Sequence, residues 1–197
     1  GGILSEDDFR TYQPQIVEPL CVNLRGSGSA QFQFFTPPPP SGGITALAIV
    51  QTVERFHPPE MAPWSAEYFH IFAEATKACW RERHEWLGDP DFVNVPFDRL
   101  LSDRAADARA EEIRTGRIAR GKAATDQSPH TANVVAADAA GHMISLTATQ
   151  GWMYGSHLVV GDLGLVLNHG MSRFDYTPGH PNRPEAGKRM QHNMSPM

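Results

Sequence analysis

The chain has 197 residues, of which 41% are hydrophobic and 20% are charged, and its formal net charge at pH 7 is −5. This length and composition fit a folded protein with a sizeable core, and the negative charge gives no reason to expect a nucleic acid or an anionic membrane as partner. No apolar run approaches a membrane span, and the first residues are unlike a signal peptide.

The N-terminal part of the sequence predicts a short helix and two strands, followed by a proline-rich segment. An acidic helix is expected near residues 5–12, and strands near residues 19–24 and 30–35. Residues 36–43 contain four consecutive prolines and a glycine pair. On composition alone such a segment is more often a linker than part of a packed domain.

Three helices are expected before the middle of the chain. The first spans residues 44–56 and buries Leu47, Val50 and Val53. The second starts after Ser65 and ends near Gly88, with a predicted buried stripe of Tyr68, Phe69, Phe72, Ala75, Thr76, Cys79 and Trp80. Ser102 caps a third helix over residues 103–115, which ends at Gly116; its mixed charges are more typical of a solvated face than of a binding patch.

Residues 131–149 predict a β-hairpin whose loop is Ala139-Ala140-Gly141. Counting outward from this loop, Asp138 lies opposite His142 and Thr131 lies opposite Thr149. Both faces of the hairpin are largely apolar, so we expect it to be covered on both sides within a layered structure. Paired threonines are common in strands, and their spacing alone favours a structural role over a catalytic one.

The segment before the hairpin, residues 117–130, has a small and polar composition with no apolar period, which is typical of an exposed, loose loop. The two cysteines and nine histidines form no pattern of metal ligands, and there is no phosphate-binding loop. We therefore expect no metal and no other cofactor. Cys79 is expected to be a small core residue.

The sequence resembles the gamma-glutamyltransferase (gamma-glutamyltranspeptidase) family over essentially its whole length. The residues that carry the resemblance in the second half are Thr131-Ala132-Asn133, Gly141, Ile144-Ser145, Thr147, Thr149, Tyr154-Gly155-Ser156, Gly164 to Asn168, Met171, Phe174, Pro178-Gly179, Gly187-Lys188-Arg189 and Met194-Ser195-Pro196. Those in the first half are Gly1-Gly2, Asp8-Phe9, Tyr12, Pro38 to Gly43 and Gly88-Asp89-Pro90.

The resemblance implies an α/β fold, the four-layer αββα sandwich of N-terminal nucleophile hydrolases, which this chain alone need not complete. Residues 1–197 would then form a single domain, with no boundary at the proline-rich segment 36–43. Residues 1–130 would be the end of a large-subunit-like region and 131–197 the start of a small-subunit-like region. The family's precursors cut themselves at the position of His130 and Thr131, and the two pieces stay together as a heterodimer.

The implied activity is cleavage of a small-molecule amide through an acyl-enzyme on Thr131. A threonine hydroxyl is unreactive at neutral pH, and the free α-amine that self-cleavage creates would serve as its base. Thr149 matches the family's threonine that orients the nucleophile. The family's members often work in the periplasm or outside the cell, and the sequence leaves the compartment open between these and the cytoplasm.

The substrate-binding positions implied by the resemblance are Asn133, Gly151, Gly170, Arg173, His192 and Asn193, and here the chain departs from the family. Asn133 stands where the family has a histidine, Gly151 where it has an asparagine, and Gly170 and Arg173 where it has a glutamine and an aspartate. His192 and Asn193 replace two serines. Replacing the aspartate by Arg173 reverses a local charge, which favours an acidic or amine-free acyl group over a gamma-glutamyl group. The plainer alternative is that Arg173 points into solvent.

Two expected parts of the family's active site lie outside this sequence. The arginine that grips the donor carboxylate comes before Gly1 in the usual order, and the glycine pair of the oxyanion hole comes after Met197. A site without oxyanion donors is expected to lose roughly 10²-fold to 10³-fold in rate. An alternative function therefore stays open, that of a non-catalytic or unprocessed relative with a binding or structural role.

Overall fold

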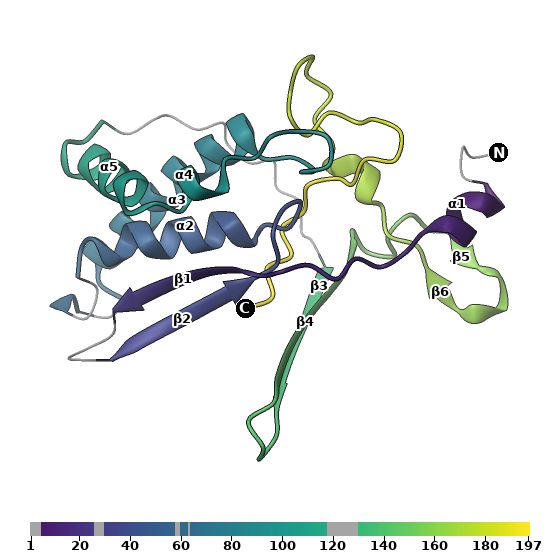
Figure 1. Ribbon diagram of the computed structural model, residues 1–197, viewed down its shortest axis with the longest axis horizontal. Coiled ribbons are helices and arrows are strands. Elements are labelled where there is room, and N and C mark those ends of the chain that lie inside the picture. The colour runs from purple at the N-terminus through teal and green to yellow at the C-terminus, as the bar shows by residue number, and fades with distance from the viewer. Residues whose placement is uncertain (1–4, 26–29, 58–59, 63, 118–129) are drawn as a thin grey trace.

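The computed structural model describes residues 5–25, 30–57, 60–62, 64–117 and 130–197. Its elements, in chain order, are α1 (Glu6–Thr11), β1 (Leu20–Arg25), β2 (Gln31–Thr36), α2 (Gly43–Glu54), α3 (Ala66–Trp86), α4 (Phe97–Leu100), α5 (Asp103–Arg114), β3 (His130–Ala137), β4 (Met143–Gly151), β5 (Val159–Val160), η2 (Gly161–Leu163), β6 (Leu165–Val166) and η3 (Gly170–Arg173). The helices α2, α3 and α5 gather on one side, and the hairpin β3–β4 projects away from them (Figure 1).

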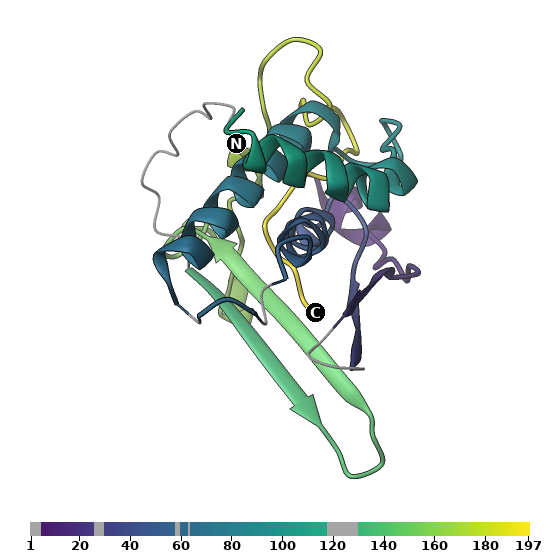
Figure 2. The same ribbon diagram turned by 90° about the vertical axis from the view of Figure 1, so that its left-hand side faces the viewer.

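The helices α2, α3 and α5 pack against one another, and α2 also contacts the β1–β2 sheet (Figure 2). One apolar cluster joins Val53 of α2, Ile71 and Ala75 of α3, and Ile113 of α5. The predicted helix starts are confirmed, because the hydroxyls of Ser65 and Ser102 each accept a backbone N–H from the first turn of their helix.

The buried stripe predicted for α3 is partly wrong. The residues that α3 buries include Ile71, Ala75, Ala78 and Cys79. Phe69, Phe72 and Trp80 are 53%, 43% and 38% exposed. Small side chains let the three helices approach closely, so the aromatic residues lie on the side of α3 that α2 and α5 do not cover. Cys79 is a core residue as predicted, and burial raises the pKa of its thiol to about 11.

The proline-rich segment packs against the C-terminal tail. His192 donates its backbone N–H to the Pro40 carbonyl oxygen at 3.0 Å, and Gly42 donates to the Met194 carbonyl oxygen at 3.2 Å. A Cβ atom at Gly42 would lie 3.0 Å from the Asn193 Cα atom. The glycine therefore allows the backbone of the tail to approach closely, which is a packing role rather than that of a flexible linker.

The hairpin has the predicted register but not the predicted burial. Thr131 pairs with Thr149, and Gly141 adopts a positive φ of 89° in the loop. The expectation that both faces are covered is wrong for the described residues, since Val135, Met143 and Ile144 are 67%, 84% and 60% exposed. An apolar pattern predicts which side chains should be buried, but it does not show which segment buries them. The described part of this chain supplies no layers that cover the two faces of the hairpin.

The described strands form three separate antiparallel pairs, β1–β2, β3–β4 and β5–β6. The described residues therefore combine helices and strands, as expected, but do not by themselves assemble the four-layer sandwich. No helix in this part of the chain is both long and apolar enough to cross a lipid bilayer.

A buried ion pair fastens the C-terminal tail to the end of α3. The Asp89 side chain is 1% exposed, and its carboxylate accepts from the Arg189 guanidinium at 2.6 Å and from the Arg189 backbone N–H at 2.8 Å. Burial raises the pKa of Asp89, but these hydrogen bonds outweigh burial and the pKa is lowered overall. This pair joins residues 100 positions apart.

An Asp89→Asn substitution is expected to lower the free energy of unfolding by about 2 to 4 kcal/mol, because it leaves Arg189 without its buried counter-ion. The matched control is Asp91→Asn. Asp91 also accepts from Arg189, at 2.9 Å, but is 63% exposed, so its loss should cost less than about 1 kcal/mol. Urea unfolding of both variants measures the difference, and equal costs would contradict this account of the ion pair.

Candidate active site

The open end of the hairpin brings two hydroxyl groups together. The Thr131 Oγ1 donates to the Thr149 Oγ1 at 3.0 Å, and the Gly151 backbone N–H donates to the same Thr149 oxygen at 3.0 Å. The Thr131 side chain is exposed, and Thr149 is half-buried. The register that the hairpin loop sets thus places the two threonines within hydrogen-bond distance, as the sequence predicted.

The regular ladder is interrupted immediately before this pair. His130 pairs with Gly151 rather than continuing the register of Thr131 and Thr149, so a bulge falls between His130 and Thr131. This is the peptide bond at which the sequence predicted self-cleavage. Most of the preceding segment that was expected to be loose, residues 118–129, lies outside the described residues.

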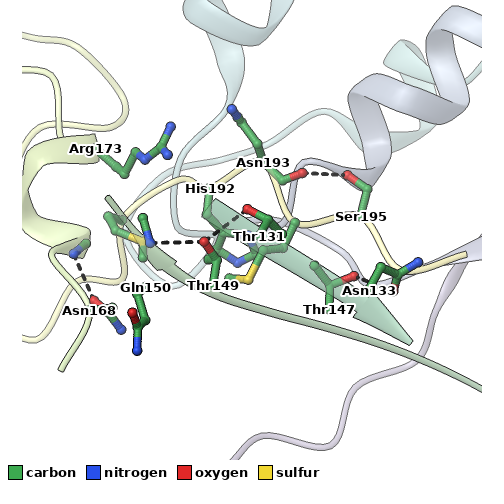
Figure 3. A pocket seen from close by; sticks show the side chains of 14 residues that line it. Thr131, Asn133, Thr147, Thr149, Gln150, Asn168, Arg173, His192, Asn193 and Ser195 are labelled. Carbon is green, nitrogen blue, oxygen red and sulfur yellow. Dashed lines mark hydrogen bonds between the residues drawn. The ribbon is translucent and has the colours of Figure 1, made fainter. Parts of the chain in front are cut away.

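A cavity of about 290 Å³ opens beside the two threonines (Figure 3). Every residue that the sequence predicted as catalytic or substrate-binding lines it: Thr131, Asn133, Thr149, Gly151, Gly170, Arg173, His192 and Asn193. They come from β3, β4, η3 and the C-terminal tail. Six further lining residues were not predicted as site residues, namely Thr147, Gln150, Asn168, Met190, Met194 and Ser195. Four of these could have been predicted from their places in the family motif, namely Thr147, Asn168, Met194 and Ser195.

Hydrogen bonds hold two asparagine side chains of the cavity lining in place. The Thr147 hydroxyl, opposite Asn133 in the ladder, donates to the Asn133 Oδ1 at 3.1 Å. Gly170 donates its backbone N–H to the Asn168 Oδ1 at 2.8 Å, which fixes the start of η3. These contacts engage one oxygen each of Asn133 and Asn168, and they leave the amide nitrogens of both side chains as donors.

The space next to Gly151 is filled by a histidine. A Cβ atom at Gly151 would lie 2.7 Å from the His169 Nδ1, and the glycine has a φ of 85°. His169 also contacts the Trp152 ring, with centroids 5.4 Å apart. A side chain at position 151 would therefore require His169 to move and would strain the backbone, so the glycine and the histidine form a matched pair.

The cavity wall is electrostatically positive. Arg173 extends its guanidinium along the wall near His192 and Asn193 (Figure 3). Arg83, which does not line the cavity, lies behind the same wall and donates to the His192 carbonyl oxygen at 3.0 Å. Burial, together with the charges of Arg83 and Arg173, lowers the pKa of His192 to about 4. His192 is therefore neutral at pH 7. Among the described residues that line the cavity, the charged side chain is that of Arg173.

Stability is expected to fall as the pH drops from 6.5 toward about 4, partly because of His192. Its folded-state pKa of about 4 lies below the ordinary value of 6.5, so in this window the unfolded chain binds a proton that the folded chain does not. His192→Gln should remove about 1 to 3 kcal/mol of the loss between neutral pH and about pH 4.5. Unfolding free energies at the two pH values measure this. His70→Gln, an exposed change on α3, should leave the loss as it is in the unmodified protein.

The described residues hold no cluster of three or more histidine, cysteine or acidic side chains arranged to bind a metal ion. Around the cavity the available chemistry is that of hydroxyl groups, amides, one guanidinium and the imidazole of His192. Such a set can present a nucleophile at one end and hydrogen-bond donors at the other.

Comparison with known proteins identifies the family to which this arrangement belongs. The gamma-glutamyltranspeptidase family model matches residues 1–197. The chain is 33% identical over 189 residues to the glutathione hydrolase proenzyme of Escherichia coli (strain K12), covering 92% of this chain and 32% of that protein. It is 30% identical over 200 residues to the acylase ACY 1 proenzyme of Pseudomonas sp. (strain SE83), covering 100% of this chain and 35% of that protein.

The crystal structure of cephalosporin acylase from Bacillus halodurans superposes with a TM-score of 0.79 at 27% identity, covering 98% of this chain and 34% of that one. The chain thus spans about a third of the length of these relatives. The relatives are hydrolases and acylases, two of them named as proenzymes. The resemblance read from the sequence is confirmed, and this chain belongs to the gamma-glutamyltranspeptidase family.

Proposed function

We propose that this chain carries the nucleophile and part of the acyl pocket of an autoprocessing threonine N-terminal nucleophile hydrolase. The observation that carries the proposal is the hydrogen bond of 3.0 Å between Thr131 and Thr149 at the edge of a cavity lined by all the predicted catalytic and substrate-binding residues. The names of the relatives, glutathione hydrolase and acylase proenzymes, support an amide-cleaving reaction that follows processing.

In the precursor, the Thr131 hydroxyl attacks the carbonyl carbon of His130, and the peptide nitrogen of Thr131 leaves. Water then opens the resulting ester and releases residue 130 as a carboxylate. The register shift between His130 and Thr131 supports this step, because the peptide bond to be cut lies where the regular ladder is interrupted. Thr131 then begins a new chain with a free α-amine.

In the mature enzyme, the α-amine of Thr131 accepts the proton from its own hydroxyl as that oxygen attacks the amide substrate. The acyl group passes to Thr131, the amine product leaves, and water or an acceptor amine resolves the ester. Thr149 orients the attacking oxygen. A hydrogen bond of this kind contributes on the order of 1 kcal/mol to stability, but a misplaced nucleophile lowers the rate far more.

Residues 1–130 and 131–197 then stay together as the parts of a heterodimer within one folded unit. Contacts between them support this, since the second piece is fastened to the first through Asp89 and Arg189, through Arg83 and Asn193, and through Gly42 and Met194. The four-layer αββα sandwich would be completed by layers that cover the exposed faces of the β3–β4 hairpin.

The acyl group that fits best is acidic or lacks an α-amine. A gamma-glutamyl donor carries an ammonium group, and the described residues that line the cavity include no aspartate or glutamate to receive it. Arg173 would repel that ammonium and attract a carboxylate. We therefore expect glutaryl or oxamyl amides to be cleaved in preference to gamma-glutamyl amides.

A panel of gamma-glutamyl, oxamyl and glutaryl anilides, tested on the full-length protein, examines this proposal. The expected result is self-cleavage of the precursor and the highest kcat/KM with an acyl group that has no α-amine. A clear preference for the gamma-glutamyl anilide would overturn the pocket argument. Failure to cleave itself or any anilide would favour the alternative, a non-catalytic relative with a binding or structural role.

A further inference from the structure

Arg83 of α3 is buried and reaches the wall of the cavity from behind. It is 5% exposed, and its Nη2 donates both to the His192 carbonyl oxygen and to the Asn193 Oδ1, each at 3.0 Å. Its Nη1 donates to the Thr45 hydroxyl at 3.3 Å, and its guanidinium carbon lies 5.0 Å from the centre of the Trp80 ring. Among the described residues, all of these partners are neutral.

A buried arginine without a carboxylate partner is costly, and the same helix bundle contains a contrasting case. Arg109, which is 2% exposed, pairs with Glu82 at 2.6 Å, so its charge is compensated within the fold. The charge of Arg83 is compensated by none of the partners named above, although burial lowers its pKa only to about 10 and it stays charged at neutral pH. Its positive charge therefore adds to that of Arg173 at the same end of the cavity.

Arg83 also determines which polar atoms of the cavity wall remain free to bind a ligand. A guanidinium can only donate, so it engages the amide oxygen of Asn193, and the amide nitrogen is the polar group of that side chain that Arg83 does not bind. Within the described part of the chain, the buried Nδ1 of His192 has no hydrogen-bond partner. The wall segment formed by His192 and Asn193, called here the His192–Asn193 strip, thus carries polar groups that Arg83 does not bind, and it lies next to two positive charges.

We propose that Arg83 is a positioning residue that sets substrate specificity: it holds the His192–Asn193 strip with its donors toward the cavity and favours an acyl group that ends in a carboxylate. The inference rests on the proposed function and deepens it by assigning the acyl selectivity to a residue outside the cavity lining. The matching ligand is the gamma-glutamyl group without its amine, which is a glutaryl group.

The test compares Arg83→Gln, which removes the charge but keeps a donor, with Arg83→Lys, which keeps the charge, in the full-length protein. The substrates are glutaryl anilide and its neutral analogue, in which a carboxamide replaces the terminal carboxylate. We expect the ratio of kcat/KM for the two substrates to fall about tenfold in Arg83→Gln and to be largely kept in Arg83→Lys. Arg81→Gln is the matched control, because Arg81 lies on the same helix but pairs with Glu112.

Binding is measured separately, by the shift in Tm that glutarate and glutaramide cause, since neither compound needs to be hydrolysed. Glutarate should raise the Tm of the unmodified protein and of Arg83→Lys more than that of Arg83→Gln. Equal responses of the unmodified protein to glutarate and glutaramide would overturn the inference, even if amides are cleaved. Glutarate binding that depends on Arg83 in a protein that neither cuts itself nor cleaves amides would support the inference and reject the proposed catalysis.

Discussion

Thr131→Ala in the full-length protein is expected to leave a single uncut chain and to lower amide hydrolysis by about 10⁴-fold or more. The substitution removes the oxygen that both the self-cleavage and the acyl-transfer steps require, so both should be lost together. Thr131→Ser keeps a hydroxyl group and should restore slow cleavage. Denaturing electrophoresis and hydrolysis of an anilide substrate measure the two activities.

The matched control for this experiment is Ser145→Ala, which removes a hydroxyl from β4 at a position that does not line the cavity. This variant should be cut as completely as the unmodified protein. If Thr131→Ala were also cut normally, the nucleophile would have to be another residue. The Thr131–Thr149 hydrogen bond would then be a cross-strand contact with a structural role only.

Arg173→Asp is expected to move the acyl preference toward gamma-glutamyl amides by about 10²-fold relative to glutaryl amides, because it replaces a repulsive charge by an attractive one for the α-amine. The measurement is the ratio of kcat/KM for gamma-glutamyl and glutaryl anilides. Arg183→Asp makes the same charge change at an exposed tail position outside the cavity and should leave the ratio nearly unchanged. Equal shifts in the two variants would mean that Arg173 acts only through the overall charge.

Much of the local structure could be predicted because it depends on neighbours in the sequence. Ser65 and Ser102 begin helices through contacts within one turn, and Gly141 fixes the loop that sets the hairpin register. Once that register is known, the approach of Thr131 to Thr149 follows. The predicted gathering of Arg173, His192 and Asn193 came instead from the family resemblance, because no local rule joins η3 to the tail.

The remaining features could not be predicted because they depend on contacts between distant segments. The periodicity of α3 did not reveal which side faces its neighbours, so Phe72 and Trp80 were predicted to be buried but are exposed. Arg83 reaches Asn193 across 110 positions, and a pattern of charges along α3 does not indicate this contact. The fit of His169 beside Gly151 likewise appears only once β4 and the segment after β6 lie side by side.

The most direct test of the account is the intact mass of the purified full-length protein, combined with sequencing of any new N-terminus. The account predicts two associated polypeptides, the second of which begins at Thr131 with a free α-amine. A chain that stays whole on prolonged incubation, or a cut at any other peptide bond, would contradict the claim that Thr131 becomes a catalytic N-terminus.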